Sequence, residues 1–371
     1  MSLRERLKTG SRPSSPQQDL YKQFGLLGNP FPPASQTAGH PHSHSPADDE
    51  IEARVANFIN EHRSQVVVIE GTQGVGKTNL LNFWEAEIKD ALGDSEGYYV
   101  IRYLADPEAS FDSTLRRLFQ ELGVEFVQKL GKKLAHNKGE IDAARNPEIR
   151  SALHMLAAKP EDLNRATLFR DWLLCLRILK GHREELDVQY RLDTVESKTG
   201  ALRDIVIVSS KVGLLEGIFL LLDELEKQAG VLGATAVVRY LSALRALIDA
   251  LPQHLFMMLA VTPDAMIRYS AALPAFRSRL QNPIVLQPLD DEGKALALAN
   301  FYVTHARESA EKSRGAAPAG TQELLSDEQI KAVFQDLRRT GERRGDIGVR
   351  QREFLQFLHD QVERFISNGA G

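Results

Sequence analysis

One string of eight residues, GTQGVGKT at 71–78, constrains this chain more than any other feature of the sequence. It matches the phosphate-binding pattern G-x-x-x-x-G-K-[ST], in which glycines allow backbone amides to surround phosphate oxygens. The β-branched run at 65–70 precedes it and a helical pattern over 79–90 follows it. A chance glycine-rich turn would not need these neighbours, so the strand–loop–helix order favours a nucleotide-binding loop.

The motif assigns a task to each of its polar residues. Lys77 reaches the β- and γ-phosphates, Thr78 offers a hydroxyl to Mg²⁺, and the positive end of the following helix faces the same anion. ATP and Mg²⁺ are therefore the expected cofactors. The residues expected at the nucleotide are Gly71, Thr72, Gln73, Gly74, Val75, Gly76, Lys77, Thr78 and Asn79.

A second apolar run, 217–222, ends in two carboxylates, Asp223 and Glu224. The carboxyl ends of parallel strands form the ligand-binding edge of an α/β sheet. We expect Asp223 to hold Mg²⁺ and Glu224 to orient and polarise the water that attacks the γ-phosphate. Acids after a strand also serve as helix N-caps, so this assignment depends on the phosphate-binding loop.

Four runs with the character of buried strands alternate with helical patterns, at 65–70, 98–104, 217–222 and 255–261. This alternation predicts an α/β fold with a parallel sheet covered on both faces. Lys77 and Asp223 lie 146 residues apart, more than one strand–helix–strand passage needs, so about 124–205 is predicted to be a helical insertion. After Pro288 only helical patterns remain, and the string SDEQ at 326–329 has the form of a capping box that opens a helix.

The order of these motifs, followed by LFMMLAVT at 255–262 and PAFRSRL at 274–280, resembles that of AAA+ ATPases over about residues 20–366. The resemblance is to their DNA-associated branch: origin-recognition-type initiators, transposition-regulator ATPases and P-loop proteins of phage-defence islands. It implies an AAA+ type parallel sheet with flanking helices, a helical insertion and a C-terminal helical lid. The strings that carry the DNA-associated resemblance are FGLLGNPF at 24–31, LLLDELEK at 220–227 and GVRQREFL at 348–355.

The same resemblance divides the chain and gives roles to polar residues outside the loop. Thr262 matches the sensor of the γ-phosphate or attacking water, although many members have Asn there. Arg277 or Arg279 matches the arginine finger that reaches a neighbouring subunit, and Arg350, with Arg352 as the alternative, matches the lid arginine; ordinary solvated arginines are the competing interpretation. The expected parts are a flexible tail and leader at 1–47, the P-loop ATPase domain at 48–287 and the helical lid at 288–371.

The function these features favour is an ATP-hydrolysing protein that couples nucleotide state to assembly or remodelling of a protein–nucleic acid complex, in a DNA transaction or in phage defence. A slow-hydrolysing switch or scaffold that recruits an effector protein, and a motor acting on protein clients, remain the alternatives. The expected partners are further copies of the chain, in a ring or filament, with DNA and an effector as candidates.

Net charge and composition bear on nucleic-acid binding, on membrane insertion and on the cellular compartment. The net charge of −4 excludes a strongly basic nucleic-acid binder, so DNA contact needs a local patch such as Lys129, Lys132, Lys133 and Lys138. A solvated helix face is the favoured explanation of these four lysines. No apolar run approaches the about 20 residues of a membrane span, and the single cysteine suits the cytoplasm.

Two further features carry little chemistry. His40, His42 and His44 lack nearby carboxylate or thiolate ligands, which favours a flexible linker over a zinc site. Cys175 falls in an apolar helical pattern without a catalytic grouping.

Overall fold

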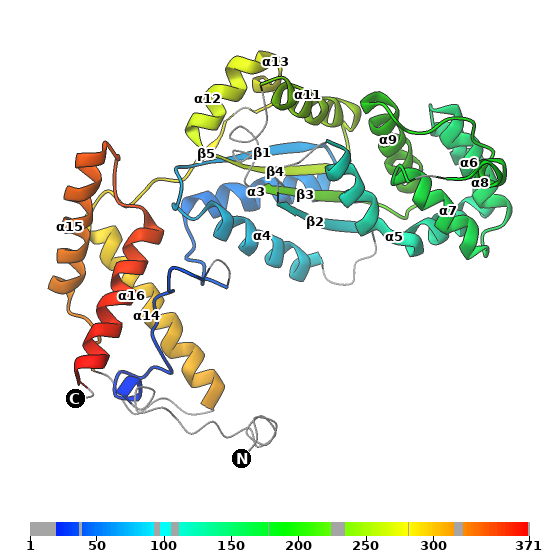
Figure 1. Ribbon diagram of the computed structural model, residues 1–371. Coiled ribbons are helices and arrows are strands. Elements are labelled where there is room, and N and C mark those ends of the chain that lie inside the picture. The colour runs from blue at the N-terminus through cyan, green and yellow to red at the C-terminus, as the bar shows by residue number, and fades with distance from the viewer. Residues whose placement is uncertain are drawn as a thin grey trace. The chain divides into compact units, whose positions relative to one another are not determined.

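A computed structural model describes residues 20–36, 39–92, 97–104, 111–176, 178–223, 234–280, 282–314 and 322–369. The chain forms two compact units (Figure 1). The first consists of Met1–His44, Thr72–Asn79 and Leu286–Gly371, and the second of Ser45–Gly71 and Leu80–Val285. The short loop segment of the first unit therefore interrupts the second unit along the sequence.

The second unit is built on a parallel sheet of five strands in the order β2-β3-β4-β1-β5. The strands are β1 (Gln65–Glu70), β2 (Tyr98–Leu104), β3 (Gly217–Asp223), β4 (Leu255–Val261) and β5 (Ile284–Val285). The four strands predicted from apolar runs are present, and the parallel α/β fold class is confirmed. Strand β5 was not predicted, because two residues are too few for a pattern.

Apolar side chains bury both faces of this sheet. Every residue of β3 and β4 is buried. On one face Phe219 of β3 contacts Phe58 of α3 (Pro46–Glu61), with ring centroids 5.1 Å apart. On the other face Leu220 and Leu222 belong to a core cluster that extends to α11 (Ala234–Ala250). Figure 1 shows α4 (Lys77–Leu92) below the strands and α11 above them, so the strands are covered as the continuous runs predict.

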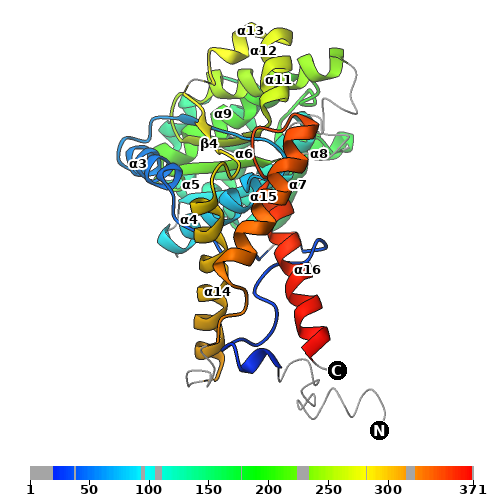
Figure 2. The same cartoon turned by 90° about the vertical axis from the view of Figure 1, so that its left-hand side faces the viewer.

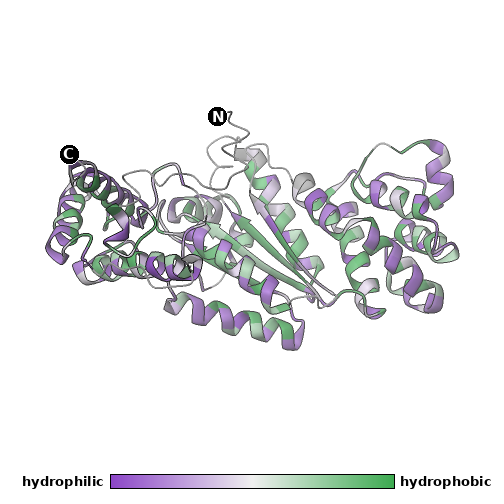
Figure 3. Ribbon diagram, turned by 90° about the horizontal axis from the view of Figure 1, so that it is seen from below, coloured by the Kyte–Doolittle hydropathy of each residue, from purple (hydrophilic) through white to green (hydrophobic). Residues whose placement is uncertain are grey.

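The helical insertion lies between β2 and β3 and shares one continuous apolar core with the sheet. Its long first helix, α5, breaks at Gly123, whose φ of 74° is left-handed. The elements of this segment are α5 (Phe111–His136), η1 (Lys138–Ala143), α6 (Pro147–Ala158), α7 (Leu163–Leu173), α8 (Lys180–Leu186) and α9 (Val195–Lys211). Figure 3 shows these helices with hydrophilic and hydrophobic sides and the strands as hydrophobic.

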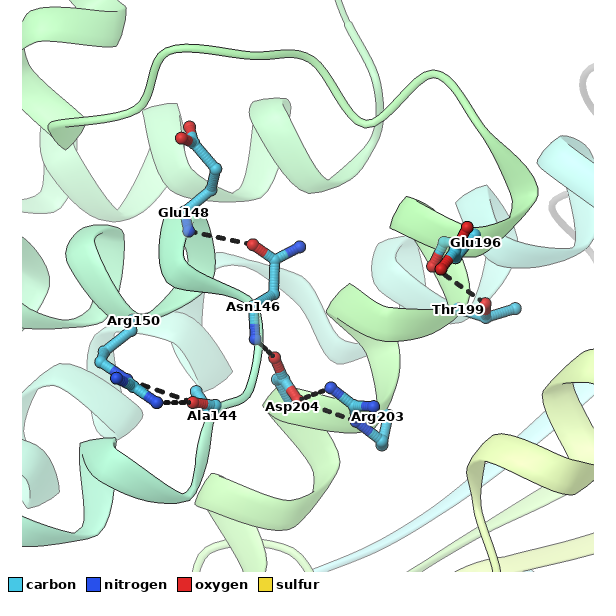
Figure 4. Close-up of polar contacts among 8 residues, drawn as sticks. All are labelled: Ala144, Asn146, Glu148, Arg150, Glu196, Thr199, Arg203 and Asp204. Carbon is cyan, nitrogen blue, oxygen red and sulfur yellow. Dashed lines mark hydrogen bonds and ion pairs between the residues drawn. The ribbon is translucent and has the colours of Figure 1, made fainter.

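One carboxylate is fully buried inside the insertion. Asp204 of α9 accepts a hydrogen bond of 2.7 Å from the backbone amide of Asn146 and pairs with Arg203 at 2.7 Å (Figure 4). Asn146 in turn caps α6 by accepting from the amide of Glu148 at 2.9 Å. This network satisfies the buried charge and fixes the start of α6.

The second unit also contains two helices after β4: α12 (Pro263–Ala272) and the short α13 (Pro274–Arg277). The first unit contains α14 (Glu292–Arg314), α15 (Asp327–Arg344) and α16 (Gln351–Gly369). The capping box predicted at the start of α15 is present, since Ser326 and Gln329 exchange hydrogen bonds of 2.8 and 3.3 Å. Within the described parts of the chain, no helix combines the length and apolar character needed to cross a bilayer.

The leader segment packs against these C-terminal helices (Figure 2). Its buried residues Tyr21, Phe24, Leu26 and Phe31 share a core with Phe354 and other residues of α14–α16. Polar contacts join the same partners: the Tyr21 hydroxyl donates to Glu363 at 2.9 Å, and the Asn29 amide donates to the His359 carbonyl at 3.0 Å. The aromatic leader is therefore an integral part of the helical unit.

Candidate nucleotide-binding site

The phosphate-binding loop starts at the carboxyl end of β1. The Gly71 amide donates to the carbonyl of Val261, the last residue of β4, at 3.1 Å. Within the loop, Gly74 and Gly76 have φ values of 84° and 102°, which residues with a Cβ rarely adopt. The buried Val75 lies between them and anchors the turn. These glycines are required by the backbone, which is the geometry expected of a phosphate cradle.

Lys77 opens α4 and is 7% exposed. Its ammonium group donates to the Thr72 carbonyl at 3.3 Å, so the side chain folds back over its own loop. Thr72 and Gln73 are exposed, whereas Thr78 and Asn79 are half-buried. The loop thus gathers backbone amides, one buried cation and two threonine hydroxyls in nine consecutive residues.

The leader also reaches this loop. The Asn79 side-chain amide donates to the Pro41 carbonyl at 3.1 Å. His40, next to it, has its pKa lowered from the ordinary value by burial and by the positive charge of Arg352, against an opposing hydrogen bond with the Gln36 carbonyl. Sequence reasoning missed this neighbourhood, because nothing in the histidine-rich string signals a partner 38 residues further along the chain.

The N-terminus of α16 lies against the loop as well. The Arg352 amide donates to the Gly74 carbonyl at 3.1 Å, and a Cβ at Gly74 would lie 3.5 Å from the Cβ atoms of both Arg350 and Arg352. The Arg350 guanidinium pairs with Asp346 at 3.0 Å, whereas Arg352 is exposed. Both candidate lid arginines therefore lie beside the phosphate-binding loop, in the same compact unit.

The predicted magnesium ligand lies at the carboxyl edge of the sheet. Asp223 ends β3, is 1% exposed and forms an ion pair of 2.7 Å with Arg102 of β2. Sequence reasoning missed Arg102, because one arginine inside a strand pattern does not reveal which carboxylate it meets. Glu224, the predicted base, lies outside the described residues.

Thr262 follows β4 at the same edge. Its hydroxyl oxygen accepts a hydrogen bond of 3.3 Å from the Ala265 amide and so caps α12. The hydroxyl proton is not consumed by this contact, because the hydroxyl acts there as the acceptor. The sensor role of Thr262 stays a prediction.

The two finger candidates differ in their surroundings. Arg279 donates to Asp249 at 2.8 Å, and Asp249 also pairs with Arg245 at 3.4 Å. Arg277, at the end of α13, is exposed, and within the described part of the chain its guanidinium makes no hydrogen bond or ion pair. Of the two arginines, Arg277 is therefore the one whose guanidinium has no partner among the residues that the structure describes.

Other candidates give weaker signals. Lys132 pairs with Glu161 at 3.0 Å, and Lys133 and Lys138 are exposed. Across the described ranges, no group of three or more His, Cys, Asp or Glu could hold a metal ion.

The helical assignment of Cys175 was wrong. Cys175 lies beyond α7 with a φ of 58°, because the chain turns there, and its thiol contacts the Leu192 carbonyl at 3.2 Å.

No protein-family model and no curated protein matches the chain. In fold it is similar to the Aeropyrum pernix ORC2 protein in ADPNP–ADP complexes, with 12% identity and a TM-score of 0.44 over 89% of this chain and 72% of that chain. The ADP form of the same protein gives 12% identity and a TM-score of 0.42 over 88% and 71%.

Proposed function

We propose that this protein binds ATP with Mg²⁺ and hydrolyses it. The observation that carries the proposal is the loop after β1, where left-handed Gly74 and Gly76 flank Val75 and the buried Lys77 folds over the turn. Such a loop presents amides and one cation to a chain of phosphates, and the N-terminus of α4 adds its dipole.

The oxygen ligands fit magnesium. Mg²⁺ is commonly held by one or two carboxylates together with substrate phosphates, and this chain offers the Thr78 hydroxyl and the Asp223 carboxylate. Magnesium bound with the nucleotide neutralises charge on the phosphates. Glu224 would accept the proton of the attacking water, while Lys77 and the loop amides hold the γ-phosphate.

Nucleotide state is proposed to control assembly. The exposed Arg277 has no partner in its own chain among the described residues, so it is available to reach the nucleotide of a second copy. Head-to-tail contacts of this kind generate rings or filaments. We further propose cytoplasmic assemblies that act in a DNA transaction or phage defence, with DNA or an effector as the client.

Two substitutions test the enzymatic proposal. Lys77→Ala is expected to weaken ATP binding, whereas Glu224→Gln is expected to keep binding and slow hydrolysis, because an amide is not a base. Lys89→Ala is the matched control, since Lys89 lies at the exposed end of the same helix. Turnover at the wild-type rate in Glu224→Gln would remove the assigned base, and unchanged binding in Lys77→Ala would contradict the nucleotide site.

The client is tested by measuring ATP turnover with double-stranded DNA, single-stranded DNA and RNA. Stimulation by one of these supports remodelling of a nucleic-acid complex. Nucleotide-dependent assembly with little turnover under all conditions favours the switch instead.

A further inference from the structure

The proposed magnesium ligand already faces a cation of its own chain. Nη2 of Arg102 lies 2.7 Å from Oδ2 of Asp223, and the side chains are 12% and 1% exposed. Both residues belong to the second unit, so the pair is internal to one compact body.

The strand register explains how the pair forms. Arg102 is aligned with Leu221, and Asp223 is aligned with Leu104, two residues further along each strand. Because side chains alternate between faces, Arg102 and Asp223 project from the same face of adjacent parallel strands. The guanidinium thus reaches diagonally along the strands to the carboxyl edge.

This arrangement has an electrostatic consequence. A carboxylate with 1% exposure needs a compensating charge, and Arg102 supplies one. A magnesium ion bound to Asp223 would bring a second, divalent cation to the same carboxylate. The guanidinium and the metal ion would then repel each other while both are attracted to the negative charge of the same carboxylate.

We propose that Arg102 competes with Mg²⁺ for Asp223 and thereby sets the magnesium concentration at which nucleotide binds. This inference rests on the proposed function, because it assumes that Asp223 is a magnesium ligand. Arg102 is a specificity-determining residue in this scheme, because its guanidinium lowers the affinity of the Asp223 carboxylate for the metal.

The insertion provides a matched control. Arg203 and Asp204 form a buried pair with the same separation, 2.7 Å, and side-chain exposures of 19% and 0%. That pair lies in a structural network with Asn146 (Figure 4). Arg203→Gln removes an equivalent charge from an equivalent environment, so it separates a specific effect on magnesium from general loss of a buried ion pair.

The experiment is a magnesium chloride titration of the binding of a fluorescent ATP analogue to the full chain. Because Arg102→Gln removes a positive charge that competes for the same carboxylate, it is expected to lower the half-saturating magnesium concentration by about tenfold. Arg203→Gln is expected to match the wild type. An Arg102→Gln protein that needs the same or more magnesium would overturn the proposal, since a positioning or merely structural arginine predicts that result.

A second variant covers failure of the first to fold. Arg102→Lys keeps the charge on a different side chain, so its half-saturating magnesium concentration is expected between those of the wild type and Arg102→Gln. A requirement above that of the wild type contradicts competition. The melting temperature in magnesium chloride without nucleotide gives a second readout: Arg102→Lys should gain more from the metal than the wild type does, and an equal gain counts against the proposal.

The two hypotheses fail differently. If the wild type binds the analogue without any dependence on magnesium, the assumed magnesium site is wrong, and the proposed competition between Arg102 and magnesium is wrong as well. If the wild type depends on magnesium and the Arg102 variants respond as it does, only the competition is wrong.

Discussion

The backbone amide of Arg352 donates a hydrogen bond of 3.1 Å to the backbone carbonyl of Gly74. Helix α16 therefore meets the phosphate-binding loop through main-chain atoms, with the Cβ atoms of Arg350 and Arg352 both close to Gly74. Because this contact does not use the arginine side chains, their guanidinium groups are not needed to maintain it. The loop and the start of α16 form one structural element on which nucleotide binding is expected to depend.

Substitution of Gly74 should disturb this element. Ala at a φ of 84° is strained, and a left-handed residue with a Cβ costs about 1–2 kcal/mol. The new Cβ would lie at ordinary contact distance from its neighbours, so strain rather than collision is the cause. Gly74→Ala is expected to lower the free energy of unfolding in urea by about this amount and to weaken ATP binding. Gly28→Ala, with no atom within 4 Å of its added Cβ, is the control; equal results for the two variants would contradict the strain.

The finger assignment predicts a contrast between two neighbouring arginines. Arg277→Ala should keep ATP binding and lower turnover by about a thousandfold, the low end for an arginine finger. Arg279→Ala should lose only its exposed pair with Asp249, worth at most about 1 kcal/mol, and keep its turnover.

Mixing subunits tests whether the finger acts between chains. Arg277→Ala protein mixed with Lys77→Ala protein should recover part of the turnover, because intact loops then meet intact arginines. Full activity of Arg277→Ala alone, together with only monomers in mass photometry with ATP, would refute the assignment.

The buried Asp48 of α3 predicts a stability effect in α4. The indole nitrogen of Trp84 donates to this carboxylate at 3.0 Å, and Asp48 also accepts from the amide and hydroxyl of Ser45. Trp84→Phe removes one donor from a buried charge and is expected to cost about 1–3 kcal/mol in urea unfolding. Asp49→Asn, on the exposed side of the same turn, is the control, and a loss no larger than that of the control would contradict the interpretation.

The lowered pKa of His40 predicts a pH effect. Burial, with a contribution from the charge of Arg352, makes the folded protein bind a proton at His40 less tightly than the unfolded chain, whose ordinary pKa is 6.5. The free energy of unfolding should therefore fall as pH drops below 6.5 towards the lowered value. His40→Gln should flatten that part of the profile and leave it unchanged above. His154→Gln, at an exposed position, should retain the wild-type slope, and a steeper slope in His40→Gln would show that the sign is wrong.

The strands were predictable because their burial is local information. In β3 and β4 every residue is buried, so an unbroken apolar run marks each of them. Gly74 and Gly76 of the loop were predictable for the same reason, since each adopts a positive φ that residues with a Cβ rarely adopt.

Partners brought together from distant parts of the chain were not predictable. Arg102 meets Asp223 across 121 positions, and Asn29 meets Glu363 across 334. Such pairs depend on strand order and helix packing, and no local pattern in a single sequence reveals either of them. A role for Asp223 could therefore be predicted from the sequence, but its ion pair with Arg102 could not.

The packing of the leader against the last helix has a consequence for synthesis. The ring of Phe24 lies 6.0 Å from that of Phe365, so their common core forms only after Phe365 has been synthesised. At about 5–20 residues per second, roughly 20–70 s separate the two on the ribosome. During this interval the residues of the second unit are synthesised, whereas the helices that pack against the leader are not yet complete. The nascent chain would therefore form the core shared by the leader and α16 only after the strands of the sheet have been synthesised.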